Sequence, residues 1–234
     1  MANPPYSPSR PCRLEEVARW DFAADVIVIG FGAAGASAAI EAANAGARVS
    51  LFEVASGSGG TSAMAGGDIY LGGGGGTRVQ RANGYQDSTE DFYRYIAMAG
   101  GPDADLERVR IYADHALLHF RWLEEQGVPY RNTHIPNKVQ APGTGDCLIW
   151  SGSEAAAPFC DLAKPAPRGH VIKHIGWGGG RPLVDVLDDQ RDRRPGRHLP
   201  AVIVREHTGN DHHRVRLPPL RGEARLAGLA LVEE

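Results

Sequence analysis

The 234-residue sequence has little cysteine and no long apolar run, and both absences narrow its class. Its three cysteines, Cys12, Cys147 and Cys160, form no Cys-x-x-Cys pair. We therefore expect neither a zinc site nor a disulfide framework, and the reduced thiols of a cytoplasmic protein are the simpler interpretation. No stretch of about 18 apolar residues could span a membrane. The Pro- and Ser-rich segment Met1–Pro11 has no apolar centre of the kind that secretory signals contain.

Aromatic residues make up only 7% of the chain, so the core must rest mainly on Ala, Val, Ile and Leu. The net charge of −3 gives no basis for binding nucleic acid or an anionic membrane. Four histidines, His198, His207, His212 and His213, have no spacing typical of metal ligands, and no cysteine or carboxylate completes a set. We therefore expect no metal site, and a small-molecule substrate as the partner.

Glycine is abundant instead: the chain has 30 glycines, most of them within residues 30–76 and 176–180. Clustered glycine is typical of tight turns and of backbone that approaches a ligand closely. The composition divides the chain into three segments: an N-terminal extension over 1–24, a domain over 25–190 and an atypical arginine-rich tail over 191–234.

The domain begins with a predicted β-α-β unit. Asp25–Ile29 contains a continuous β-branched run, which is typical of a parallel strand buried on both faces. An Ala-rich helix is predicted over Ala34–Ala45, where Gly46 ends it, and a second strand over Ala47–Glu53. The unit spans about 30 residues, the usual length of this motif. It predicts an α/β fold with a Rossmann-type parallel sheet.

A dinucleotide-binding motif lies between this strand and this helix. The segment Gly30-Phe31-Gly32-Ala33-Ala34-Gly35 fits Gly-x-Gly-x-x-Gly, and Glu53 closes the next strand. Glu53 could accept hydrogen bonds from the ribose hydroxyls of FAD or NAD, and its charge disfavours the 2′-phosphate of NADP. The alternative is a tight turn without a ligand, but strand, glycines, helix and acid all agree with the motif.

Each residue of the motif has an expected role. Gly30 permits the tight turn, Gly32 lets the backbone approach a pyrophosphate, and Gly35 lets the helix pack closely on the strand. The helix N-terminus, with Ala33 and Ala34, offers free N–H groups and the positive end of the helix dipole to the phosphates.

A glycine-rich loop over Gly57–Gly76 follows, with almost no helical period. Its hydroxyl groups could donate hydrogen bonds to a second phosphate, and its paired glycines would leave room for a flat flavin ring. The alternative is a flexible Gly/Ser linker, for which the interleaved Met64, Asp68 and Ile69 are untypical. The predicted cofactor contacts in this loop are Gly60, Thr61, Ser62, Gly66 and Gly67.

With these motifs the sequence resembles the FAD-binding family of fumarate reductase and succinate dehydrogenase flavoproteins, and within it the 3-ketosteroid dehydrogenases of the Δ4-(5α) type. The resemblance covers about residues 25–187. It implies FAD as cofactor, hydride transfer between a substrate carbon and flavin N5, and a 3-ketosteroid as substrate. The alternatives are another flavoenzyme of the family, such as a fumarate reductase, and a non-catalytic FAD-binding fragment. Later segments that carry the resemblance are Leu71–Gly74, Gly101–Asp103, Phe120–Pro129, Gly152–Glu154 and Lys164–His170.

Two departures from the family qualify what the resemblance implies. Members that attach FAD covalently do so through a histidine in the glycine-rich loop, and this chain has no histidine before His115, so non-covalent FAD is implied. The catalytic tyrosines of the family lie in a later part of the chain, which this sequence lacks. The catalytic residues are therefore unknown, and a truncated N-terminal half without dehydrogenase activity is expected.

The tail has nine arginines and no lysine. Translation of a gene in a shifted reading frame can produce such a composition. We expect the family resemblance to fade near Leu187, and one interpretation of the segment after it is translation in a shifted reading frame. The alternative is a genuine short member whose tail supplies two extra strands, at Ala201–Val204 and Leu226–Val232.

The rest of the pattern predicts a helix capped at Ser88, a long helix over Asp103–Gln126, mostly loop over 128–170 and a short helix over Pro182–Leu187. Arg168 and His170 belong either to a substrate mouth or to a solvated loop. Tyr70 is expected to be a packed aromatic rather than a residue that lines the active site.

Overall fold

The structure is a computed structural model that describes residues 23–138, 148–172, 178–192 and 201–203. The predictions for the four tail histidines and for Leu226–Val232 lie outside these residues. The described helices and strands are, in chain order, β1 (Val26–Ile29), α1 (Ala33–Asn44), β2 (Val49–Glu53), α2 (Gly60–Met64), β3 (Asp68–Tyr70), α3 (Arg78–Ala82), α4 (Thr89–Ala99), α5 (Leu106–Glu125), β4 (His134–Lys138), β5 (Leu148–Trp150), α6 (Phe159–Leu162), β6 (Gly169–Val171), α7 (Gly180–Asp192) and β7 (Ala201–Ile203).

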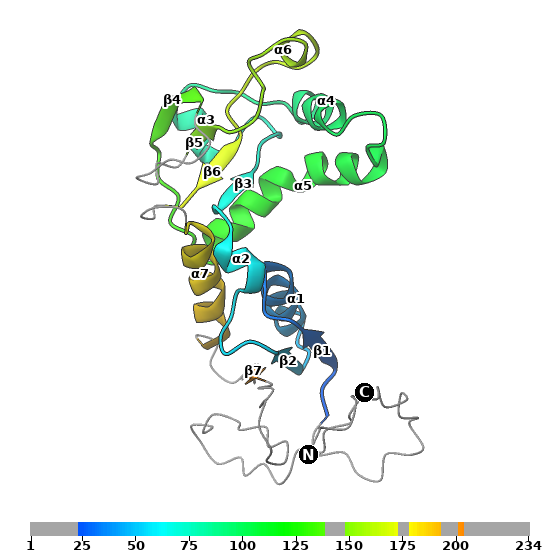
Figure 1. The fold of residues 1–234 in the computed structure, drawn as a ribbon, viewed down its shortest axis with the longest axis vertical. Helices are drawn as coiled ribbons and strands as arrows, with labels where there is room; N and C mark the ends of the chain where they lie inside the picture. The colour runs from blue at the N-terminus through cyan, green and yellow to red at the C-terminus, as the bar shows by residue number, and fades with distance from the viewer. Residues whose placement is uncertain (1–22, 139–147, 173–177, 193–200, 204–234) are drawn as a thin grey trace, which may run out of the picture.

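A parallel sheet in the order β1-β2-β7 forms one end of the molecule (Figure 1). Val26 of β1 is in register with Val49 of β2, and Leu51 of β2 is in register with Ala201 of β7. The predicted β-α-β unit with a parallel sheet is therefore present. β7 belongs to the segment 191–234, and its pairing agrees with the alternative that this part of the tail supplies a strand.

The helix α1 packs on this sheet through small side chains. Ala36, Ala39 and Ala43 are buried together with Ile40, and they share a core cluster with Leu51 and other residues of β1 and β2. Alanine leaves little side chain between helix and sheet, so the two backbones approach closely. Sequence and structure agree on this helix to within one residue at each end.

β1 is not buried on both faces, so the prediction from its apolar run is wrong for the described residues. The side chains of Ile27 and Ile29 are 61% and 87% exposed, whereas Val28 is buried. Successive side chains of a strand point to opposite faces, and α1 covers only the face that carries Val28. β1 is also an edge strand of the described sheet, since its only partner there is β2.

A second sheet, in the order β3-β6-β5-β4, lies toward the other end of the molecule (Figure 1). β6 pairs antiparallel with both β3 and β5, while β5 pairs parallel with β4. One expectation is corrected in part, since Gly57–Gly76 contains α2 and β3 rather than loop alone. Among the described residues of 128–170 most are irregular, as expected, although β4, β5, α6 and the start of β6 lie there.

The predicted helices α4 and α5 are present, and they pack against each other and the second sheet. The hydroxyl oxygen of Ser88 accepts the N–H of Asp91 at 3.0 Å and so caps α4, as expected. Phe120 and Leu123 of α5 are buried, but Leu106 at its start is 53% exposed and is not part of the core. A further helix, α3, was not expected from the sequence; Thr77 and Gln80 form its capping box.

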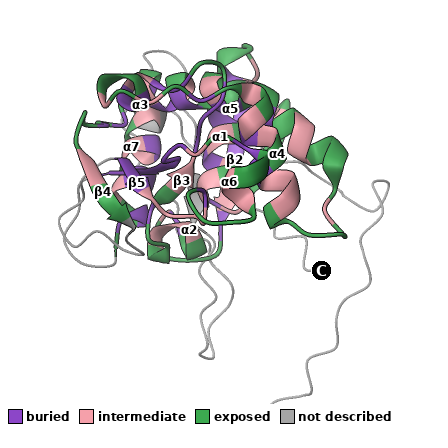
Figure 2. Ribbon diagram, turned by 90° about the horizontal axis from the view of Figure 1, so that it is seen from above, coloured by how far each residue is buried: buried purple, intermediate pink, exposed green. Residues whose placement is uncertain are grey.

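The helix α7 connects the two parts of the core. It is longer than the predicted Pro182–Leu187. Its Leu183 packs in the cluster of the second sheet, and its Leu187 packs in the cluster around α1. The burial colours in Figure 2 show the purple, buried segments gathered between the helices. Among the described helices, none is long and apolar enough to cross a membrane.

Candidate functional site

The turn between β1 and α1 has the geometry that the glycine motif predicts. Gly30 has a φ of +93°, a left-handed conformation that favours glycine, and its N–H donates to the carbonyl oxygen of Phe52 at 2.7 Å. Gly32 is the N-cap of α1 and, as a glycine, has no side chain that could cap the helix. The first turn of α1 therefore presents backbone N–H groups and the positive end of the helix dipole, a suitable place for a phosphate.

The other two glycines of the motif meet different neighbours. A Cβ on Gly35 would overlap the carbonyl oxygen of Gly30 and lie 3.1 Å from its carbon, so glycine is required there for the fold itself. A Cβ on Gly32 would meet only ordinary contacts, 3.4 Å to Ser62 Oγ and 3.8 Å to the carbonyl oxygen of Gly59. The fold therefore does not require glycine at position 32, which agrees with a role for Gly32 in the approach of a cofactor pyrophosphate.

Glu53 is buried at the end of β2 and bonded to the same turn. Its Oε2 accepts the N–H of Phe31 at 2.6 Å, and its Oε1 accepts the N–H of Ala55 at 2.8 Å. The bond from Ala55 is the main cause that lowers the pKa of this carboxyl, against the opposing effect of burial. Glu53 is therefore ionised at neutral pH. Each carboxylate oxygen keeps a second lone pair for a ribose hydroxyl.

The glycine-rich loop lies directly against the turn. The N–H of Gly59 donates to the carbonyl oxygen of Phe31 at 2.6 Å, and the hydroxyl oxygen of Ser62 accepts the N–H of Ala33 at 3.1 Å. Two segments that are far apart in the sequence thus meet at the N-terminus of α1. Among the predicted cofactor contacts, the structure brings Gly32, Ala33 and Ser62 together.

The remaining predicted contacts lie farther along the helix and the loop, and most of them are exposed. Ala34, Gly60, Thr61 and Gly66 are exposed, and Gly67 is buried against the backbone of Gly179. Exposed backbone and a hydroxyl beside the turn are what an incoming cofactor needs to contact. The donor set, the buried acid and the uncapped helix end together fit FAD.

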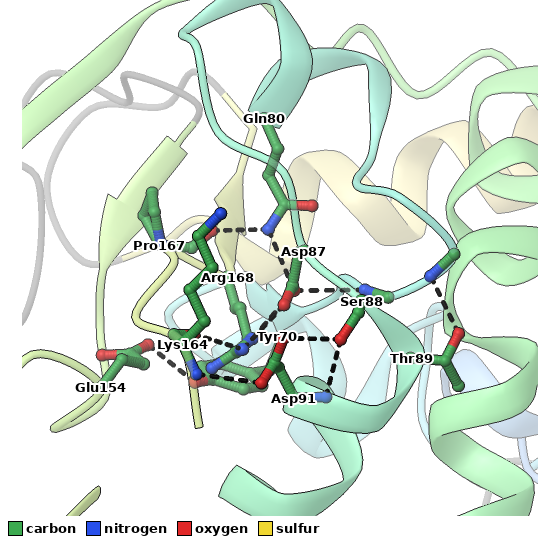
Figure 3. A network of polar contacts seen from close by, with 12 residues as sticks. Tyr70, Gln80, Asp87, Ser88, Thr89, Asp91, Glu154, Lys164, Pro167 and Arg168 are labelled. Atoms are coloured by element: carbon green, nitrogen blue, oxygen red, sulfur yellow. Dashed lines mark hydrogen bonds and ion pairs between the residues drawn. The ribbon is translucent and has the colours of Figure 1, made fainter. Parts of the chain in front are cut away.

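Arg168 and His170 lie neither at a substrate mouth nor in a solvated loop, because both are fully buried. Arg168 forms a bidentate ion pair with the equally buried Asp87, with Nη2···Oδ1 at 2.7 Å and Nε···Oδ2 at 2.9 Å (Figure 3). Neighbouring Gln80 donates to the same Asp87. This pairing could not be predicted from local pattern, since 81 residues separate the two charges.

Tyr70 is a packed aromatic, as expected. Its ring stacks on those of Phe92 and Tyr95, with centroids 5.8 Å and 5.7 Å away, and its hydroxyl donates to Glu154 Oε1 at 2.7 Å (Figure 3). Burial, followed by the charge of Glu154, raises the pKa of Tyr70. The network of Arg168, Asp87, Tyr70 and Glu154 therefore stabilises the second sheet. In the part of the chain that the structure describes, no group of histidine, cysteine and carboxylate side chains could hold a metal ion.

Comparison with known proteins identifies the family of the chain. A curated 3-oxo-5-alpha-steroid 4-dehydrogenase of Comamonas testosteroni is 35% identical over 164 residues, which are 69% of this chain and 30% of that protein. The crystal structure of the 3-ketosteroid-Δ4-(5α)-dehydrogenase of Rhodococcus jostii RHA1 in complex with 4-androstene-3,17-dione has a TM-score of 0.75 and 39% identity. It covers 85% of this chain, and the chain covers 43% of it.

A flavocytochrome c3 fumarate reductase in its open conformation is also similar, with a TM-score of 0.56 and 27% identity over 76% of this chain and 26% of that one. The chain thus spans less than half the length of these relatives.

The family model described as FAD binding domain matches residues 25–214. The match continues beyond Leu187, where the resemblance was expected to fade. The chain belongs to the FAD binding domain family, whose cofactor is FAD.

Proposed function

We propose that this chain is the FAD-binding part of an oxidoreductase that transfers hydride between a carbon of a 3-ketosteroid and the flavin. One observation carries the proposal. The uncapped N-terminus of α1 lies beside Ser62 and Glu53 in a chain that is 39% identical to a steroid dehydrogenase over most of its length. The fumarate reductase structure has a lower TM-score, 0.56 against 0.75, and covers less of this chain, which makes fumarate the less favoured substrate.

The described residues bind and orient the cofactor. The N–H groups of the first turn of α1 would hold the pyrophosphate, and Glu53 would accept the ribose hydroxyls. Thr61 and Ser62 would donate to a phosphate, while the exposed Gly60 and Gly66 leave the backbone open toward the flavin ring; Gly67, buried against Gly179, would act through the shape of the loop. Bound FAD supplies the redox chemistry at N5, and the protein supplies position and electrostatics.

The cofactor is proposed to be held without a covalent bond. The glycine-rich loop over 57–76 contains no histidine, and the covalent members of the family that the sequence resembles use a histidine of this loop. The isolated cysteines support a cytoplasmic protein with reduced thiols, and Cys160, which the structure describes, is free.

The groups that act on the substrate are proposed to lie outside the described residues. The chain spans 43% of the steroid dehydrogenase whose structure it matches. We therefore propose that the described residues bind FAD, while other groups act on the substrate.

A chimera tests the proposal. Residues 25–190 would replace the matching part of the Rhodococcus dehydrogenase, and oxidation and reduction of 3-ketosteroids would be followed with a redox dye. A matched chimera with Gly32→Val serves as the control. We expect the first chimera to bind FAD and turn over steroids, and the control to do neither. A chimera that binds FAD and reduces fumarate but not steroids would contradict the steroid assignment.

A further inference from the structure

The short helix α2 carries predicted cofactor contacts but has no anchor of its own. It has five residues, none of them buried, and its N-cap Gly59 provides no side-chain cap. A segment with so little burial cannot hold a fixed shape by itself. Its position must come from what packs against it.

The first turn of α7 is the element that packs there, as Figure 1 shows where α2 and α7 lie side by side. The N–H of Gly180 donates to the carbonyl oxygen of Ala65 at 2.9 Å. A Cβ on Gly180 would overlap the carbonyl oxygen of Ser62 and lie 2.9 Å from that of Ala65. These neighbours are backbone atoms, so no flexible side chain could move aside.

A second close approach lies just beyond the helix. Gly67 has a φ of +77°, and a Cβ there would overlap the carbonyl group of Gly179 and lie 2.8 Å from its Cα. The backbone of Gly179–Gly180 thus contacts the loop on both sides of Ala65. Two glycines that face each other allow the two chains to approach this closely.

Side chains of α7 hold the beginning of the loop as well. Arg181 Nη1 donates to the carbonyl oxygen of Ser58 at 2.8 Å. The hydroxyl of Ser58 in turn donates to Asp188 Oδ2 at 2.8 Å. Leu183 of α7 is buried in one core cluster and Leu187 in the other, so these contacts connect the loop to the rigid part of the molecule.

We propose that Gly180, together with Gly179, is a positioning residue of the cofactor site: it fixes the loop Gly59–Gly67 in the shape that places Ser62 at the N-terminus of α1 and leaves space for the flavin half of FAD. The proposal rests on the proposed FAD site. It adds to that site a residue that the glycine motif and the loop do not include. Gly180 acts through the loop and need not touch the cofactor.

The test compares two ligands and two glycines. In Gly180→Ala the loop must shift, so contacts to the flavin half are lost, whereas ADP still meets the turn after β1 and Glu53. Loss of one hydrogen bond corresponds to about tenfold in affinity, so loss of contacts to the flavin half should raise the Kd for FAD about tenfold, while the Kd for ADP, which has the phosphates but no flavin, changes less. Gly178→Ala is the matched control, because a Cβ there meets nothing within 4 Å.

The thermal midpoint of the ligand-free protein separates positioning from folding. If Gly180→Ala does not fold, Arg181→Ala loosens the same loop without adding atoms, and it should weaken FAD binding with ADP binding retained. Equal affinity for FAD in the wild type and in the folded variant would overturn the positioning role of Gly180 and leave the proposed function in place. An equal loss of affinity for FAD and for ADP would do the same. A wild type that binds no FAD would overturn the proposed function and this inference with it.

Discussion

The carboxylate of Glu53 accepts the backbone N–H of Phe31 at 2.6 Å, which bonds the end of β2 to the turn that follows β1. The acid of the motif therefore has two roles. It fixes the turn in the conformation that exposes the N-terminus of α1, and it remains ionised to receive the ribose, because the N–H of Ala55 helps to lower its pKa.

Glu53→Gln should weaken FAD binding by about tenfold to a hundredfold, since a hydrogen bond to a charged group contributes roughly 1.5–3 kcal/mol. The amide has only one acceptor oxygen, so it cannot keep both backbone N–H bonds and the ribose. Titration of flavin fluorescence measures the effect. An affinity equal to that of the wild type would show that Glu53 does not contact the ribose.

Gly32 and Gly35 should separate binding from folding. Gly32→Val should abolish FAD binding with a smaller effect on stability, because a Cβ there meets the protein only at ordinary contact distances. Gly35→Ala should lower the free energy of unfolding by about 1–3 kcal/mol, because its Cβ overlaps the backbone of Gly30. Urea unfolding and FAD titration of both variants check this. Similar stability losses in the two would contradict it.

The β-α-β unit could be predicted because all its signals are local. Strand, turn and helix lie within one short segment, and glycine spacing and side-chain type determine each of them. The second sheet could not be predicted in this way. Its strands β3, β5 and β6 have three residues each, and Asp68 pairs with Val171 across more than a hundred residues. Such short strands show no period that distinguishes them from loop.

The sequence also gave no basis for the burial of Arg168. A charged residue that follows two prolines is typical of an exposed loop, and the ion pair with Asp87 makes its burial possible. The exposure of Ile29 is the opposite case, since its apolar strand predicted burial. Both errors arise because tertiary neighbours, not local pattern, decide what covers a side chain.

Arg168→Met should destabilise the protein by about 3–5 kcal/mol, because it leaves the buried carboxylate of Asp87 without its cation. Arg108→Met serves as the control, since the ion pair of Arg108 with Asp105 is exposed and its loss should leave the unfolding midpoint nearly unchanged. Urea denaturation measures both. Equal small effects would contradict the role assigned to the buried pair.

His170 should make stability depend on pH. Its Nδ1–H donates to the carbonyl oxygen of Arg168, and its Nε2 accepts from Thr77, both at 2.9 Å, so the folded protein holds the ring neutral. Burial lowers the pKa of His170 from 6.5 to about 4. Between these values only the unfolded chain takes up the proton, so stability should fall as pH falls from 6.5 to 4, by on the order of 3 kcal/mol.

The variant His170→Gln should lose most of this pH dependence. His119→Gln is the control, because burial lowers the pKa of His119 as well but without the hydrogen bonds of His170 on both ring nitrogens. Thermal unfolding at pH 5 and pH 7 compares them. A wild type that is equally stable at both values would refute the assignment of a neutral buried ring.

The exposed face of β1 should cause association at high concentration. Ile27 and Ile29 are exposed on a strand whose outer edge has no partner in the described sheet, and such an edge pairs readily with other chains. Replacing both by threonine keeps the β-branched shape and should reduce light scattering. The control Leu118→Thr changes an exposed leucine on α5 and should not.

The measurement that tests the account most directly is a titration of the purified chain with FAD, followed by acid precipitation. The account predicts saturable binding that Gly32→Val abolishes, with all of the flavin released to the supernatant by acid. Absence of saturable binding would contradict the assignment of the β1–α1–β2 unit as an FAD site, and flavin retained in the pellet would contradict the non-covalent attachment.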